Sequence, residues 1–93
     1  MMASGVSVER MRRPPTHPGE MFEEEFRRPL KLRKTEAAHA LGLSPADYRQ
    51  FVTGKLDVSR ELATKLSAVT GTSDRFWLNL QTSLDQWRAF HRR

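Results

Sequence analysis

The segment "LGLSPADYRQ", residues 41–50, ends one helical pattern and begins another at once. Gly42 is placed to adopt the left-handed conformation just past a helix end. Ser44 predicts an N-cap, Pro45 suits the first turn of a helix, and Asp47 stands three residues after the serine, as in a capping box. The segment therefore predicts two helices joined by a tight turn, which is a helix-turn-helix.

The helices on either side of this turn are expected over residues 35–41 and 45–53, because apolar residues recur there with helical spacing. Their inward positions are Ala37, Ala38, Leu41, Tyr48, Phe51 and Val52. On the second helix, a step of about 100° per residue leaves Ala46, Gln50 and Thr53 on the opposite side. No large apolar side chain lies there, so this side is expected to face a polar partner.

A helix is also expected before the motif, over residues 18–28, with Pro29 ending it. Leu30 and Leu32 are then expected to pack in a short turn under the core. Three acidic residues are interpreted as a solvated face placed favourably near the positive start of this helix: Glu23, Glu24 and Glu25.

Two further helices are expected after the motif, the fourth between Ser59 and Gly71 and the fifth after Ser73. Apolar residues of the fifth helix recur at the 3-4-3 spacing of a heptad seam: Trp77, Leu80, Leu84 and Trp87. A small domain has limited capacity to cover two tryptophans, so one edge of the seam is expected in the core and another in a dimer interface.

The composition limits the class of protein. The chain has 93 residues, of which 38% are apolar, so one small domain with a single core is expected. The absence of cysteine fits a reducing compartment. The formal charge of +5 indicates a polyanionic partner only where the cations share one surface. Residues 1–16 lack apolar spacing and are expected to form a disordered, flexible basic arm, which leaves residues 17–93 as the folded domain.

Several functional classes have no support in the sequence. No nucleophile stands with a neighbouring base and an orienting acid, and no glycine-rich phosphate-binding loop is present, so an enzyme is not expected. The three histidines are scattered along the chain, so neither a metal nor another cofactor is expected. No window approaches the roughly 20 apolar residues of a membrane span. A soluble, intracellular protein with no membrane partner is expected.

Longer motifs connect the chain to a known family. Ala38, with Gly42 four residues later and the inward Tyr48 and Phe51 beyond, resembles the helix-turn-helix of DNA-binding repressors. With HPGEMFEEEFRRPLKL before it and GTSDRFWLNLQTSLDQW after it, the chain over residues 17–90 is similar to the HigA-type, or VapI-type, antitoxins of the XRE-like class. The resemblance implies an all-α, five-helix, lambda-repressor-like domain with a central helix-turn-helix.

The same resemblance implies a function. An antitoxin of this type belongs to a type II toxin-antitoxin pair and acts in the bacterial cytoplasm, associated with the nucleoid. It neutralises a HigB-type ribonuclease toxin of the RelE class. It also binds double-stranded operator DNA as a homodimer and represses its own operon.

Position by position, the resemblance implies a DNA-binding surface around the second helix of the motif. Gln50 lies where such repressors place a base-reading side chain, and an amide there can pair with adenine. Positions that usually meet phosphate hold Lys34, Ser44, Arg49 and Lys55. The expected DNA-binding residues are Lys34, Thr35, Ser44, Pro45, Ala46, Asp47, Arg49, Gln50, Thr53 and Lys55.

Some positions depart from the family pattern. Pro45 and Ala46 occupy early recognition-helix positions, yet neither side chain can donate a hydrogen bond to a base, and Asp47 adds a negative charge near the groove. Arg33 replaces the serine that usually precedes the first helix of the motif, and losing that cap is expected to cost about 1 kcal/mol. Lys31 stands where the family commonly has glycine.

Two alternatives to a DNA-binding antitoxin remain open. The chain is alternatively a toxin-sequestering module with weak or no specific DNA binding. Its surface would be the acidic face of the first helix, because a toxin that grips RNA is expected to be cationic. The toxin-contacting residues would be Glu20, Glu23 and Glu24. The other alternative is a stand-alone transcriptional repressor.

Overall fold

Helices form every regular element of the computed structural model, which describes residues 14–91. The elements along the chain are α1 (Pro18–Phe22), the π-helical segment η3 (Glu23–Arg27), α2 (Arg28–Leu30), α3 (Lys34–Ala40), α4 (Pro45–Val52), α5 (Arg60–Thr70) and α6 (Asp74–His91). The first three follow one another without a break and form one helix, so the described chain has the five helices that the sequence predicts. Most of the predicted N-terminal arm lies outside the described residues.

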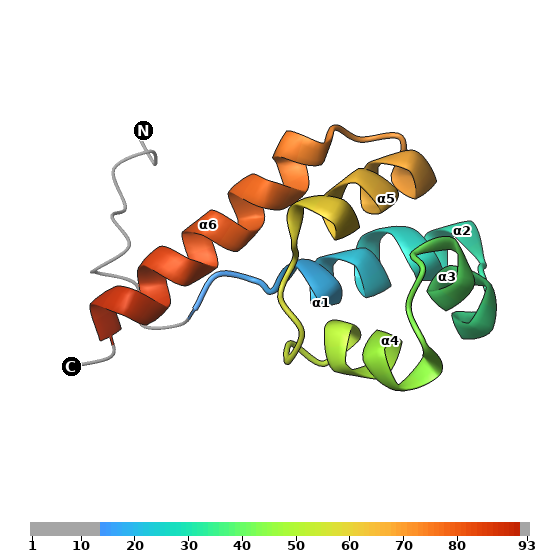
Figure 1. Ribbon diagram of the computed structural model, residues 1–93, viewed down its shortest axis with the longest axis horizontal. Helices are drawn as coiled ribbons and strands as arrows, with labels where there is room; N and C mark the ends of the chain where they lie inside the picture. Colours follow the sequence, from blue (N-terminus) through green and yellow to red (C-terminus); the bar gives the residue numbers. More distant parts are fainter. Residues whose placement is uncertain (1–13, 92–93) are drawn as a thin grey trace.

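The core lies where α1, α4 and α6 meet. In Figure 1, α1 runs between the pair α5 and α6 on one side and α4 on the other, and α3 packs beside α4. Phe22 of α1 is fully buried, with its ring centroid 6.3 Å from that of Phe51 and 6.4 Å from that of Trp77. Burial of each such side chain contributes roughly 1.5–3 kcal/mol. These three aromatic residues therefore join helices that are far apart in the sequence.

The turn of the helix-turn-helix closes as predicted. Gly42 adopts a φ of 69°, and its N–H donates to the carbonyl of His39 at 3.0 Å. The N–H of Leu43 donates to the carbonyl of Ala38 at 2.9 Å. These two hydrogen bonds form a Schellman motif, which satisfies the carbonyl groups left at the end of α3.

The predicted serine caps are also present. Ser44, Ser59 and Ser73 each accept a hydrogen bond from the backbone N–H three residues later, at 3.0, 3.1 and 3.1 Å. A complete capping box would also need the Asp47 carboxylate to accept a hydrogen bond from the N–H of Ser44. No such bond is present among the described residues, so this part of the prediction is wrong. The serine alone caps α4.

The prediction that Pro29 ends the first helix is wrong. The helix continues to Leu30 and ends at Lys31, which adopts the left-handed conformation at a φ of 59°. The π-helical turn at Glu23–Arg27 shifts the hydrogen-bonding register by one residue, so the helix accommodates a ring that lacks an N–H. The prediction that Leu30 packs under the core is wrong for the same reason, because the extended helix leaves its side chain 52% exposed.

The predicted heptad seam of α6 divides between two surfaces. Trp77 and Leu84 are 0% and 4% exposed, so they form the edge of the seam that lies in the core. Leu80 and Trp87 are only partly buried. The reason is geometric, since steps of about 100° per residue place Leu80 and Trp87 about 60° around the helix from Trp77 and Leu84. None of the helices within residues 14–91 is long and apolar enough to cross a membrane.

Candidate nucleic-acid interface

The start of α1 fixes the position of α4. His17 caps α1, because its Nδ1 accepts a hydrogen bond from the N–H of Gly19 at 2.9 Å. Gly19 lies directly against the end of α4, where an added Cβ would stand 1.7 Å from the carbonyl oxygen of Phe51. Only glycine allows the two backbones to approach this closely. The HPGE motif therefore places α1 across α4.

The exposed side of α4 is polar, as the sequence predicts. Tyr48 is 3% exposed and Phe51 is fully buried, so the aromatic side of α4 faces the core. Gln50 is exposed on the opposite side, and within residues 14–91 its amide makes no hydrogen bond. All of the predicted DNA-binding residues are exposed: Lys34, Thr35, Ser44, Pro45, Ala46, Asp47, Arg49, Gln50, Thr53 and Lys55.

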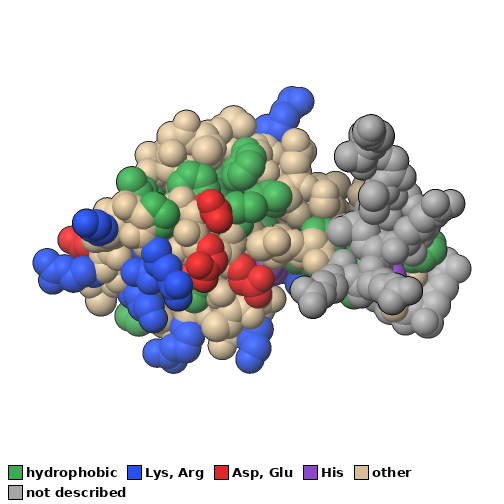
Figure 2. All heavy atoms as spheres, turned by 180° about the vertical axis from the view of Figure 1, so that it is seen from behind, with side chains coloured by type: hydrophobic (Ala, Val, Ile, Leu, Met, Phe, Trp, Pro, Cys, Tyr) green, Lys and Arg blue, Asp and Glu red, His purple; other side chains and the backbone are tan. Residues whose placement is uncertain are grey.

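A shallow hollow lies between α3 and α4. Its volume is about 210 Å³, and it is lined by Lys34, Thr35, Ala38, Pro45, Tyr48, Arg49 and Val52. Lys34 and Arg49 bring positive charge to an otherwise apolar surface. At the start of α3, Arg33 offers no capping acceptor, as expected, and instead the Glu36 carboxylate accepts from the Arg33 N–H at 2.8 Å. Figure 2 shows further Lys and Arg side chains along the lower edge of the molecule, toward the end that holds α3 and α4.

A partly buried ion pair, between Glu23 and Arg27, anchors the inner side of α4. The Tyr48 hydroxyl donates to the Glu23 carboxylate at 3.1 Å, and Arg27 donates to the same carboxylate through Nε at 2.7 Å. Arg27 also donates to the carbonyl of Leu32 at 2.9 Å, in the loop that leads to α3. The pair therefore contacts α4 and the loop that leads to α3.

These contacts change the pKa values of the residues involved. The hydrogen bond from Arg27 lowers the pKa of Glu23. Burial and the nearby negative charge of Glu23 raise the pKa of Tyr48. The interpretation of Glu23 as part of a solvated face is wrong, because its side chain is only 12% exposed. Its carboxylate faces α4, where it accepts hydrogen bonds from Tyr48 and Arg27.

Of the three predicted toxin-contacting residues, Glu20 and Glu24 are exposed and Glu23 is not. Glu20 is exposed beside the end of α4, with its carboxylate near Gly54. Glu24 is exposed beside Arg28, with 3.5 Å between their charged groups. Glu23 is held inward by its ion pair. Figure 2 shows acidic side chains gathered near the middle of one face of the molecule.

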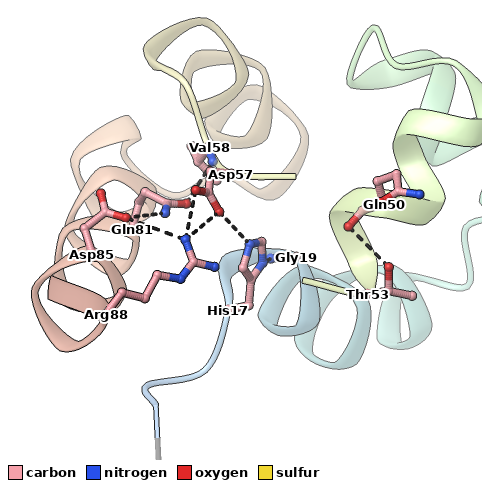
Figure 3. A network of polar contacts seen from close by, with 9 residues as sticks. All are labelled: His17, Gly19, Gln50, Thr53, Asp57, Val58, Gln81, Asp85 and Arg88. Carbon is pink, nitrogen blue, oxygen red and sulfur yellow. Dashed lines mark hydrogen bonds and ion pairs between the residues drawn. The ribbon is translucent and has the colours of Figure 1, made fainter. Parts of the chain in front are cut away.

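The segment after α4 is held by a polar network that sequence reasoning missed (Figure 3). The Asp57 carboxylate accepts hydrogen bonds from Arg88 of α6 at 2.9 and 3.1 Å. It also lies 3.3 Å from Nε2 of the buried His17. Burial alone would raise the pKa of Asp57, but the hydrogen bonds from Arg88 and His17 hold it below its ordinary value. The available sequence signal was Gln81 and Arg88, two polar residues at inward positions of α6.

Comparison with known proteins assigns the chain to a family, although no protein-family model matches it. A helix-turn-helix transcriptional regulator from Haemophilus influenzae, itself uncharacterised, is 38% identical over 81 residues, which cover 87% of this chain and 76% of the relative. The structure of the antitoxin GraA is 34% identical, with a TM-score of 0.78 over 86% of each chain. The chain belongs to the HigA/VapI-type antitoxin family of helix-turn-helix proteins.

The structure of a HigA antitoxin from Pseudomonas aeruginosa, solved with the higBA promoter, is similar to this HigA/VapI-type chain. The two are 30% identical, with a TM-score of 0.75, over 82% of this chain and 83% of the other. The resemblance stated from the sequence is thereby confirmed. The relatives are antitoxins and transcriptional regulators, which agrees with the expectation that this chain is not an enzyme.

Proposed function

We propose that this chain is a DNA-binding antitoxin that represses its own operon as a homodimer, at the nucleoid of a bacterial cytoplasm, and neutralises a HigB-type toxin. The observation that carries the DNA-binding part is the orientation of α4. Its aromatic residues Tyr48 and Phe51 face the core, while Gln50 stands exposed on a side without large apolar residues. A single helix with such a side fits the roughly 12 Å wide major groove.

The hollow beside α4 supports contact with the DNA backbone. Lys34 and Arg49 supply positive charge, and the apolar floor between them suits a deoxyribose next to its phosphate. Two relatives have been solved with DNA, the HigA of Pseudomonas aeruginosa with its promoter and PA4674 of the same organism with its operator. The fold of this chain is similar to both.

Binding to DNA from upstream of the chain's own gene tests this proposal. Gln50→Ala is expected to reduce operator affinity by about tenfold, while binding to random duplex DNA stays unchanged. Lys34→Ala is expected to weaken both kinds of DNA alike and to reduce the log–log salt slope by about 0.9. Equal losses on operator and random DNA after Gln50→Ala would contradict direct base reading.

The partly exposed stripe of α6 supports the proposed dimer. Leu80, Trp87 and Phe90 lie on one side of the helix, adjacent to the buried stripe, and Phe90 is 55% exposed. We expect Phe90→Glu to raise the dimer dissociation constant at least tenfold, because it places a charge in an apolar interface. Sedimentation equilibrium measures this, with Ala89→Glu on the opposite side of α6 as the control. An unchanged dimer after Phe90→Glu would exclude this stripe.

Exposed carboxylates on the first helix support the toxin-binding part. Glu20 and Glu24 remain accessible to a cationic partner, whereas Glu23 does not. Charge reversal at Glu24 is expected to weaken capture of the HigB-type toxin while leaving DNA binding intact. Glu61→Lys on α5 is a control with the same charge change at another exposed site. If Glu24→Lys and Glu61→Lys capture toxin like the wild type, the toxin surface lies elsewhere.

A further inference from the structure

We propose that Asp57 is a positioning residue for operator binding. It fixes the segment that follows α4 to the C-terminal half of α6, and so sets the separation of the two DNA-contacting surfaces in the dimer. This rests on the proposed function, which supplies both the operator contact of α4 and the pairing of two α6 helices. Asp57 acts through other residues and has no role in contacting DNA.

The segment after α4 is bound to the end of α4 itself (Figure 3). The segment after α4 turns at Gly54, which has a φ of 86°. The N–H groups of Lys55 and Leu56 then donate to the carbonyl of Gln50 at 2.8 and 3.2 Å, and the Thr53 hydroxyl lies 3.3 Å from the same oxygen. The backbone of the proposed base-reading residue is therefore tied directly to this segment.

The same segment is also bound to α6, at two places that lie two turns apart along that helix. The N–H of Val58 donates to Oε1 of Gln81 at 2.8 Å, and Nε2 of Gln81 donates to Asp85 at 3.0 Å. Two turns further along α6, Arg88 donates both hydrogen bonds to Asp57. The segment is thus attached to α6 along two helical turns.

His17 adds a third element to the same carboxylate. Its Nδ1 accepts from the N–H of Gly19, which leaves Nε2 as the ring nitrogen directed at Asp57. His17 is buried, and its position is fixed by the cap that it forms on α1. Asp57 therefore joins the start of α1, the segment after α4, and α6.

The direction of the C-terminal half of α6 depends on this joint. Among the described residues, Leu84 is the last buried apolar residue of α6. One turn later the next position is held by Arg88, which is 36% exposed and whose partners are Asp57 and, at 3.9 Å, Asp85 of its own helix. The residue proposed to pair with a second subunit, Phe90, lies in this same half. A change in the joint therefore alters the angle between α6 and α4, and with it the spacing of the two α4 helices.

Selection of duplexes from a random DNA library tests the proposal through the spacing of the half-sites. Wild type, Arg88→Met and Asp57→Asn are compared, and Arg75→Met is the control, because it removes the same charge from an exposed position of α6. Circular dichroism confirms that each variant is folded at the selection temperature. A shift of one base pair moves a half-site by about 3.4 Å and rotates it by about 34°.

Wild type and Arg75→Met are expected to select one spacing and to disfavour a one-base-pair change by about tenfold, because the DNA would have to deform. Arg88→Met and Asp57→Asn are expected to select the same half-site with only about twofold to threefold preference between spacings. If the variants select one spacing as strictly as wild type, the positioning role is refuted while the proposed function stands. If wild type selects no paired half-sites, both fail.

Discussion

Lys31 illustrates a cost that a single residue imposes on this fold. It adopts a φ of 59°, a region in which a side chain with a Cβ is strained and glycine is not. We expect Lys31→Gly to raise the free energy of unfolding by about 0.5–1 kcal/mol, measured by urea denaturation. Lys31→Ala removes the same charge but keeps the Cβ, so it is expected to give no such gain. Equal effects of the two substitutions would show that the backbone conformation is not the cause.

The ionisation of Glu23 is expected to make the free energy of unfolding depend on pH. Its pKa in the folded chain is lowered from an ordinary value of 4.5, chiefly by the hydrogen bond from Arg27. The stabilisation is therefore complete above pH 4.5 and is lost as the pH falls through the lower folded value. We expect wild type to lose more free energy of unfolding than Glu23→Gln between pH 5 and about pH 3.

The matched control for this titration is Glu24→Gln, at the exposed neighbouring position. Its stability curve is expected to run parallel to that of wild type. Tyr48→Phe removes the hydroxyl that donates to Glu23 and is expected to cost about 1 kcal/mol at pH 7. A Glu23→Gln variant whose stability falls as steeply as wild type below pH 4.5 would contradict the assigned role of this carboxylate.

At the scale of elements, the crossing of α1 over α4 depends on Gly19. Gly19→Ala would place a Cβ 1.7 Å from the carbonyl oxygen of Phe51 and 2.5 Å from the carbonyl carbon of the same residue. Both are backbone atoms, so relieving the overlap would displace the backbone of α4. We expect a loss of about 3 kcal/mol in the free energy of unfolding. Gly71→Ala is the control, because its Cβ would meet no atom within 4 Å and only its φ of 77° opposes it, at a cost of about 1 kcal/mol. Similar losses in both variants would contradict the close crossing.

The elements also show what the sequence predicts and what it does not. The turn at Gly42 and the serine caps follow from local chemistry, so they could be predicted from a few adjacent letters. The π-helical turn at Glu23–Arg27 could not, because it depends on contacts with α4 and on accommodating Pro29 rather than on any local pattern. The wrong end of the first helix follows from that omission, whereas the wrong surface for Glu23 follows from its contacts with Tyr48 and Arg27.

At the scale of the whole molecule, part of the candidate site could be predicted from the sequence and part could not. The exposure of Gln50 and the burial of Tyr48 follow from helical periodicity, so they could be predicted from spacing. The joint of His17, Asp57 and Arg88 brings together residues from both ends of the chain, and no local pattern indicates which distant side chains will meet. Contacts between distant segments require the folded structure.

The outer side of α4 and the start of α3 are proposed to form the surface that binds DNA. Backbone amide chemical shifts of the ¹⁵N-labelled chain, titrated with a duplex from its own promoter, test this most directly. The largest changes are expected at residues 34–35 and 46–55, with α5 unaffected. The proposed surface would be wrong if the largest changes fell on α5 or on the acidic face around Glu24 while α4 was unchanged.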